Sequence, residues 1–299
     1  MAKLVSRTRH LLRLGVMKKF KAHYPLNLTG FTLIELSIVL VIIGLIVGGI
    51  LVGKDLINSA TIRSQISQIE KYNTAANTFK LKYGGLPGDL LATDAGALGF
   101  FKFASGPALG VGDGNGAITT DNSTGDAYCR YEVLIFWRHL VEAKLIEGSY
   151  SANVGTNPGD IDSNGTIAVL PTTHEMMNAY LPEAKIGRGS SVVVGANWVA
   201  GKRGTPNYFS ISGINGTSTT NAHYFTGSTN PFTPQEAYNI DIKLDNGVPN
   251  SGRVRADNSA VDLRPLPGII VTPTASCVTS NEYVKNSNTP SCSLQIQFQ

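Results

Sequence analysis

Few residue patterns in this 299-residue chain suit a chemical role, and the clearest of them would hold a hard cation. Asp160, Asp162 and Asn164 alternate along the chain and are followed by Gly165, which matches the first half of an EF-hand calcium loop. The twelfth position is Pro171, not the bidentate glutamate that completes such a loop. We therefore expect no resident cofactor. Calcium at these three residues is one hypothesis, and a solvated turn is the other. A second acidic patch has Asp113, Asn115, Asp121 and Asp126.

Catalytic patterns are missing from the sequence. His174-Glu175 lacks the second histidine of an H-E-x-x-H zinc site, and the chain has neither a C-x-x-C pair nor a G-x-S-x-G elbow. The glycine-rich run 110–116 (GVGDGNG) is followed by no Gly-Lys-Ser/Thr and suits a flexible loop better than a phosphate cradle. These observations predict a protein that is not an enzyme.

The net charge of +4 comes from one end of the chain. Residues 1–30 carry seven basic and no acidic side chains, which leaves 25 − 7 = 18 basic against 21 acidic groups in the rest. Since no basic patch with interleaved aromatic residues follows, nucleic acid is not an expected partner. The 42% of apolar residues also excludes a disordered chain and one that crosses a membrane many times.

One hydrophobic segment dominates the sequence. Residues 31–53 read FTLIELSIVLVIIGLIVGGILVG, with Glu35 as the only charge, and a bilayer core needs about 20 such residues. The basic residues before this run place the amino terminus in the cytoplasm and the chain after Lys54 across the membrane. A cleaved signal peptide is one alternative, although the run is longer than its usual apolar region. A plain membrane anchor is another.

Glu35 argues against a plain anchor. A carboxylate within an apolar span is unfavourable unless it is paired, and such residues are usually functional. The basic residue that follows the span, Lys54, is about 28 Å away along a helix, so the partner must come from another chain or from a newly made terminus.

The segment 30–36 (GFTLIEL) resembles the processing motif of type IV prepilins and of the pseudopilins of type II secretion. This resemblance implies that prepilin peptidase cuts between Gly30 and Phe31 and methylates the amine of Phe31. It also implies that Glu35 pairs with the amine of a neighbouring subunit during assembly. The expected partners are the peptidase, membrane lipid, an inner-membrane assembly platform, and other copies or pilin-like subunits in a helical filament.

The expected function is that of a structural filament subunit. It is held in the bacterial inner membrane by a single span, with its head in the periplasm, and then enters a periplasmic or surface filament. A pseudopilin of type II secretion is an alternative within the family, and a membrane-anchored periplasmic binding module is one outside it. The sequence leaves open the filament system, the choice between a major and a minor subunit, and the role in adhesion, motility, DNA uptake or secretion. Translation from Met1 or from Met17 is equally open.

Three parts are expected in the chain: a leader at 1–30, a long helix at 31–83 and an α+β head at 84–299. No proline interrupts 31–83, and Gly84, Gly85 and Pro87 end the helix. Its second half carries an apolar stripe of Ile62, Ile66, Ile69, Ala76, Phe79 and Tyr83, whereas Arg63, Gln65, Gln68, Lys71 and Asn77 occupy other faces. The stripe suits packing on a mostly antiparallel head. Expected strands are 191–194, 208–211, 240–244, 268–271 and 294–298, and a further helix is expected at 131–146.

Cysteines are expected to stabilise the end of the head. Cys277 and Cys292 resemble the disulfide-bounded carboxyl-terminal loop of many pilins, and a compartment across the membrane is oxidising enough for this bond. Two unpaired thiols are the alternative. Cys129 is left over and is expected to be a small buried apolar residue.

Overall fold

The computed structural model describes residues 30–101, 112–118, 132–150, 174–199, 202–213, 216–217, 225–226, 230–257 and 277–298. The leader before Gly30, the leftover Cys129, the calcium candidates Asp160, Asp162 and Asn164, and the expected strand 268–271 lie outside these residues. The chain divides into two compact units, Met1–Gly53 and Lys54–Gln299. Each unit is described by itself.

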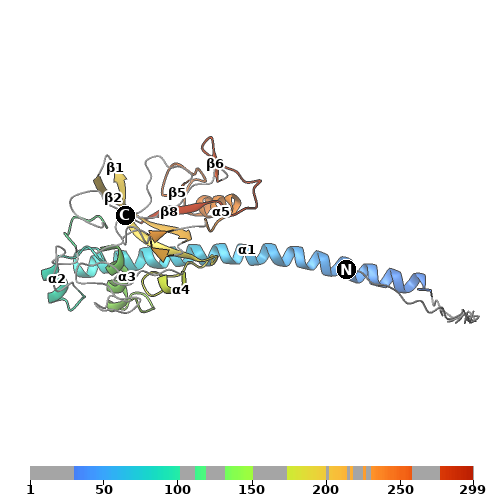
Figure 1. Ribbon diagram of the computed structural model, residues 1–299, viewed down its shortest axis with the longest axis horizontal. Coiled ribbons are helices and arrows are strands. Elements are labelled where there is room, and N and C mark those ends of the chain that lie inside the picture. The colour runs from blue at the N-terminus through green and yellow to red at the C-terminus, as the bar shows by residue number, and fades with distance from the viewer. Residues whose placement is uncertain are drawn as a thin grey trace, which may run out of the picture. The chain divides into compact units, whose positions relative to one another are not determined.

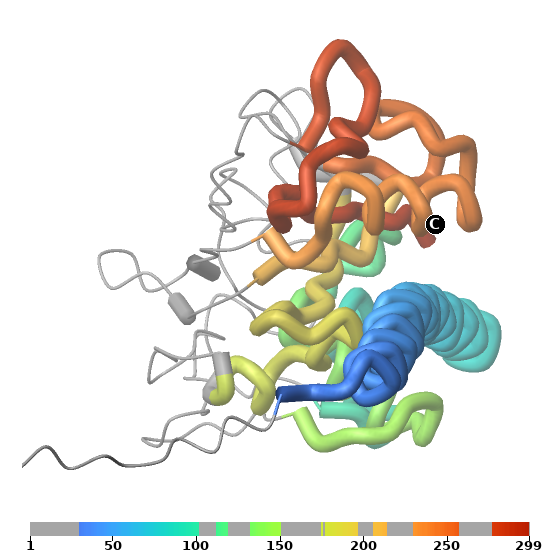
Figure 2. Tube along the Cα trace, turned by 90° about the vertical axis from the view of Figure 1, so that its right-hand side faces the viewer, coloured from blue at the N-terminus to red at the C-terminus, as the bar shows by residue number. Residues whose placement is uncertain are grey.

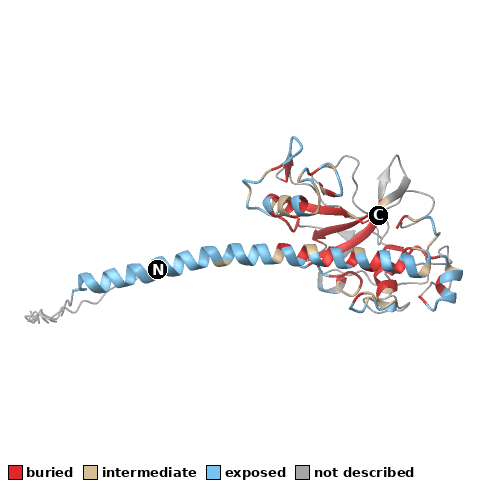
Figure 3. Ribbon diagram, turned by 180° about the vertical axis from the view of Figure 1, so that it is seen from behind, coloured by how far each residue is buried: buried red, intermediate tan, exposed pale blue. Residues whose placement is uncertain are grey.

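The helix α1 (Leu33–Tyr83) confirms the prediction of a long apolar helix near the amino terminus (Figure 1). Gly84 ends it with a φ of 82°, a left-handed conformation that favours glycine, while its N–H still donates to the carbonyl of Lys80. Buried residues occur only in the second half of α1, starting at Ile62 (Figure 3). Of the expected stripe, four residues are buried, and Ile66 and Tyr83 are half-buried.

The second unit contains a four-stranded antiparallel sheet in the order β1-β2-β8-β5. Its strands are β1 (Ser190–Val199), β2 (Lys202–Gly213), β8 (Ser293–Gln297) and β5 (Val254–Asp257). Phe209 of β2 pairs with both Val194 and Ile296, and Ile296 in turn pairs with Val254. Together with α1, this sheet confirms the α+β class. Two small hairpins accompany it, β3 (Gly216–Thr217) with β4 (Phe225–Thr226) and β6 (Val278–Thr279) with β7 (Glu282–Tyr283).

Four further helices belong to the second unit: α2 (Ala92–Ala97), α3 (Glu132–Glu142), α4 (His174–Met177) and α5 (Pro234–Leu244). Of these, α3 confirms the helix expected at 131–146, with an earlier end. The strand expected at 240–244 is wrong, because these residues form the last turns of α5. Thr233 and Glu236 form a capping box and Pro234 opens the first turn, and these local signals prevail over the alternating isoleucines 240 and 242.

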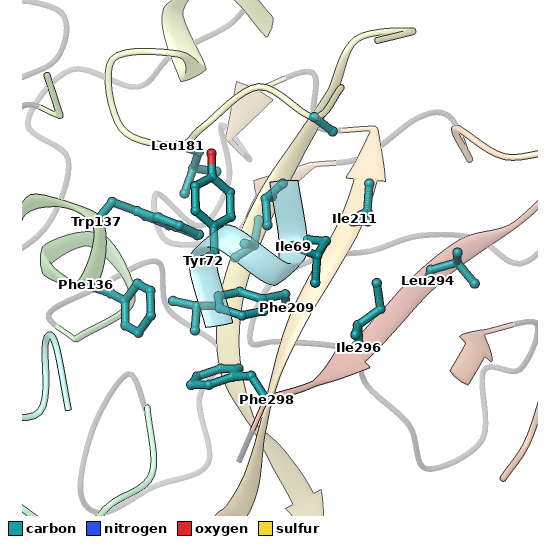
Figure 4. Close-up of a cluster of buried hydrophobic side chains, with 14 of the residues drawn as sticks. Ile69, Tyr72, Phe136, Trp137, Leu181, Phe209, Ile211, Leu294, Ile296 and Phe298 are labelled. Atoms are coloured by element: carbon teal, nitrogen blue, oxygen red, sulfur yellow. The ribbon is translucent and has the colours of Figure 1, made fainter. Parts of the chain in front are cut away.

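Aromatic side chains fill the core between α1, α3 and the sheet (Figure 4). The rings of Tyr72 in α1 and Trp137 in α3 meet edge to face with centroids 4.9 Å apart. Phe209 in β2 stacks on Phe298, which follows β8, at 4.3 Å. Such aromatic pairs stabilise a core beyond the effect of the apolar area that they bury. This cluster therefore forms the centre of the head.

Two glutamines correct the expected polar face of α1. Gln65 and Gln68 were expected on faces turned away from the apolar stripe, but both are buried. The amide of Gln68 donates to the carbonyl of Glu183 at 2.8 Å and accepts from the N–H of Lys185 at 3.0 Å. The side-chain oxygen of Gln65 accepts from the N–H of Ile186 at 2.9 Å. The glutamines are therefore core residues, because the backbone of 183–186 satisfies them.

Candidate functional site

The candidate site is the amino-terminal segment 30–57, whose apolar side chains are exposed on every side of the helix. Each large apolar residue from Phe31 to Ile57 is at least half exposed, and Phe31 itself is 82% exposed. By length and composition, α1 is long and apolar enough to cross a membrane, and it is the one such helix in the part of the chain that the structure describes. This segment is compatible with a single-pass anchor near the amino terminus.

A capping box opens α1 and involves the charged residue of the span. The hydroxyl of Thr32 accepts from the N–H of Glu35 at 3.3 Å, and Glu35 Oε2 accepts from the backbone N–H and from the hydroxyl of Thr32, each at 2.8 Å. This reciprocal pairing satisfies donors that a helix start otherwise leaves open. The T-x-x-E spacing of Thr32 and Glu35 is the sequence signal that predicts this cap.

The capping box gives Glu35 a local partner and a fixed place. Both bonds that it accepts from Thr32 fall on Oε2, so Oε1 stands outside the pair. The carboxylate is held one turn after the peptide bond between Gly30 and Phe31, which precedes the helix. A negative charge at this position also interacts favourably with the positive end of the helix dipole. The arrangement offers one carboxylate oxygen to a cation from outside the chain.

Gly30 is not required by the chain's own packing. A Cβ built at Gly30 meets nothing within 4 Å, and both Gly30 and Phe31 are exposed. The same open space surrounds Gly44, Gly48, Gly49 and Gly53 in the span. Among the described residues, no packing contact requires glycine at these positions.

The carboxyl-terminal loop is closed by the expected cysteines. The sulfurs of Cys277 and Cys292 lie at disulfide distance, 1.97 Å apart, and both residues are buried. Within the loop, the hydroxyl of Tyr283 in β7 donates to Asp241 of α5 at 2.8 Å, and Asn250 donates to Asn281 at 2.7 Å. Figure 2 shows the hairpin β6–β7 in red above the orange α5. The loop therefore has side-chain anchors in addition to its cysteines.

An acidic cluster joins the turn after α1 to the glycine-rich run. Carboxylate oxygens of Asp89, Asp113 and Glu132 lie within 4.8 Å of one another. The two oxygens of Asp89 accept from the N–H groups of Gly114 and Gly116, at 2.9 and 2.8 Å. Burial, with the nearby charge of Asp113, raises the pKa of Asp89 to about 6. The described residues 112–116 of the run 110–116, expected to be a flexible loop, are thus tied to the turn after α1.

This cluster differs from the calcium candidates that the sequence suggested. Asp113 belongs to the second acidic patch, whereas its patch neighbours Asp121 and Asp126 lie outside the described residues. Asp89 and Glu132 were not anticipated, because no short spacing connects them with Asp113. The hydrogen bonds of Asp89 and Asp113 organise the glycine-rich run.

Comparisons of the chain with family models, with curated proteins and with solved structures give no match.

Proposed function

We propose that this chain is a structural subunit of a type IV pilus-like filament. It is made as a precursor, cut by prepilin peptidase between Gly30 and Phe31, methylated at Phe31, and polymerised through the first half of α1. The observation that carries this proposal is the combination of Gly30, Phe31 and the cap-held Glu35 at the start of an exposed apolar helix.

The position of the cleavage site supports processing by a separate enzyme. The bond between Gly30 and Phe31 lies before the first helical residue, and neither residue is covered by the rest of the described chain. A protease can therefore reach it without unwinding α1. Because open space surrounds Gly30, its small size suits the fit of an enzyme better than any need of the fold.

Glu35 supports polymerisation over simple anchoring. Thr32 lowers the cost of holding the carboxylate in an apolar span, since it supplies two donors within the same chain. Cleavage before Phe31 creates an amine, and the amine of a neighbouring subunit can meet the Glu35 oxygen that Thr32 leaves outside the pair. Such a contact between unlike charges in an apolar core would fix the axial register of added subunits.

The exposed apolar side chains also suit a subunit that lies first in the membrane and later in a filament. In the precursor and in the unassembled subunit, lipid covers the exposed residues of 31–53. In a filament, the same residues pack against neighbouring helices, and Gly44 and Gly48 allow their backbones to approach closely. The head, closed by Cys277 and Cys292, then faces an oxidising medium.

A pseudopilin of a type II secretion system remains the alternative within the same family, because processing and assembly through the helix are common to both. The rival from another class is an anchored periplasmic binding module, which would keep its leader. The Gly30-Phe31 pair directly before the carboxylate favours the filament subunit, since the cap contact of Glu35 alone would serve a plain anchor equally well.

Intact-mass analysis of the membrane-extracted protein tests the proposal. In cells with a prepilin peptidase, the product should begin at Phe31 and carry one extra methyl group. Gly30→Trp should block cleavage, whereas Gly30→Ala should be cut at least in part because alanine is small. Both variants should keep a protease-resistant head, because a side chain at position 30 meets no neighbouring atom. A wild-type product that retains the leader would contradict processing and favour the anchored module.

A further inference from the structure

A buried histidine, His139, joins three separate segments of the head. His139 lies in α3 with no exposed surface. Its Nδ1 accepts a hydrogen bond from the N–H of Gly88 at 3.0 Å, and its Nε2 lies 3.0 Å from the carbonyl oxygen of Phe101. The ring is parallel to that of Phe79 in α1, with centroids 5.9 Å apart. One side chain therefore connects α3, the turn after α1, and the segment at Phe101.

The two contacts fix the form of the imidazole. A carbonyl oxygen only accepts, so Nε2 must carry the hydrogen that points to Phe101. A backbone N–H only donates, so Nδ1 must keep its lone pair toward Gly88. Both conditions are met by the neutral ring with hydrogen on Nε2, and the protonated ring meets only one of them.

The turn at Gly88 cannot easily move to accommodate a second hydrogen. Gly88 has a φ of 84°, and a Cβ at this position would lie 2.4 Å from the carbonyl oxygen of Glu132. The turn is thus packed against the start of α3. Protonation of Nδ1 would place two N–H donors against each other in a buried site, which is unfavourable unless the contact opens.

We propose that His139 is an acid-sensitive latch, and that protonation of its Nδ1 unties the turn after α1 from α3. This inference does not depend on the filament role, because it concerns only contacts within the head. The charged groups that act on the ring are Glu142, which favours its protonation, and Arg138, which opposes it, both from α3. From the other elements, Phe79 and Phe100 present aromatic rings. The carboxylate of Asp89, next to Gly88, is engaged with Gly114 and Gly116.

Burial is the main cause that lowers the pKa of His139 to about 4, from an ordinary value of 6.5. Above pH ~6.5 the ring is neutral in both the folded and the unfolded chain, so it has no effect on stability. Between pH ~6.5 and ~4 only the unfolded chain takes up the proton, and folding weakens as pH falls. The ratio of unfolded to folded chain should rise by up to about 300-fold from this group alone.

Chemical unfolding of the full chain in detergent micelles tests the latch. Wild type is compared with His139→Gln, whose amide can donate to one segment and accept from the other without titrating. The ratio of their unfolding constants should stay constant above pH ~6.5 and then widen to about 150-fold at pH ~4, with the wild type losing stability. A ratio of the two unfolding constants that stays the same from pH ~6.5 to pH ~4 would overturn the proposal.

A second measurement needs no variant and decides the matter if His139→Gln fails to fold. Hydrogen exchange of the wild-type Gly88 amide is compared with the exchange rate of an unstructured peptide at the same pH. The protection factor of Gly88 should fall between pH ~6.5 and ~4 and should stay below that of buried amides in β2, which exchange only when the whole head unfolds. Unchanged protection at Gly88 throughout this range would show that no latch opens.

Discussion

The two halves of α1 have the same backbone conformation and opposite surroundings. From Leu33 to Gly53 the apolar side chains point outward on every side, and no residue is buried. From Ile62 onward one face is buried against the head, and even two glutamines on it are satisfied by hydrogen bonds. The described chain therefore covers one face of the second half and leaves the first half exposed. Helix propensity alone cannot distinguish such halves, but the distribution of apolar and polar residues around the helix does.

The largest expected effect is on assembly. Glu35→Val should reduce filament recovery by more than about tenfold, since the amine of a neighbouring subunit loses its carboxylate partner. The head should stay folded, because every buried residue of the helix lies at Ile62 or beyond. Sheared filaments would be quantified in cells without a wild-type copy, with protease resistance of the head as the control. Normal recovery would mean that the carboxylate is incidental.

The second half should show the opposite behaviour. Phe79→Ala removes a fully buried ring and should lower the free energy of unfolding of the head by about 3–5 kcal/mol. The matched control is Leu45→Ala, at a side chain that is 72% exposed, which should leave the stability of the head unchanged. Guanidinium unfolding in micelles measures both. Equal effects of the two variants would erase the distinction between the halves.

Loss of the disulfide should affect only the head. A Cys277→Ser/Cys292→Ser variant should lose about 3 kcal/mol of stability in the loop-entropy account. Its loop should remain partly docked, because Tyr283 still donates to Asp241. Unfolding with and without reductant gives the size of the effect, and peptide mapping without reductant gives the pairing. A cross-link that includes Cys129 would contradict the assignment.

The buried glutamines offer a finer test of the second half. Gln68→Leu should lower the free energy of unfolding of the head by about 1–3 kcal/mol, because the carbonyl of Glu183 and the N–H of Lys185 lose their hydrogen-bond partner. Asn77→Leu is the control on the same helix. Asn77 is exposed and donates to Asn73, so its substitution should change the free energy of unfolding by no more than about 0.5 kcal/mol. Thermal unfolding of both variants would show whether burial or mere polarity decides the cost.

The smallest expected effect concerns the cap. Thr32→Val keeps the shape and removes the hydroxyl, so Glu35 retains only the backbone N–H of residue 32 as a local donor. Filament recovery should fall by a few-fold, and Thr32→Ser should restore it because the hydroxyl returns. A Val variant that equals wild type would show that the backbone contact alone positions the carboxylate.

The sequence was sufficient where the signal is local or periodic. The absence of proline over 31–83 and the glycines at 84 and 85 predicted α1 to within two residues at its start and at the same residue at its end. The runs at 191–194 and 208–211 lie within β1 and β2, because their apolar, β-branched and aromatic residues suit a sheet that is buried on both sides.

The failures have physical reasons. At α5, alternating isoleucines suggested a strand, although the Thr233–Glu236 box and Pro234 were legible as a helix start. The burial of Gln68 was not legible, since its backbone partner at Glu183 is 115 residues away. Asp89 and Glu132 likewise meet Asp113 only through the fold. A local pattern cannot reveal a polar residue whose satisfaction comes from a distant segment.

The glutamines of α1 have a consequence for how copies of this chain can associate. The outer edge of β1 is occupied by residues 182–184, which bond to Ser190 and Val192. The next row of backbone groups, at 183–186, is occupied in turn by the side chains of Gln65 and Gln68. An open edge would invite strand-by-strand aggregation, and here the glutamine side chains of α1 occupy the segment that flanks the start of β1. The start of this edge is therefore closed to a strand from a second copy of the chain.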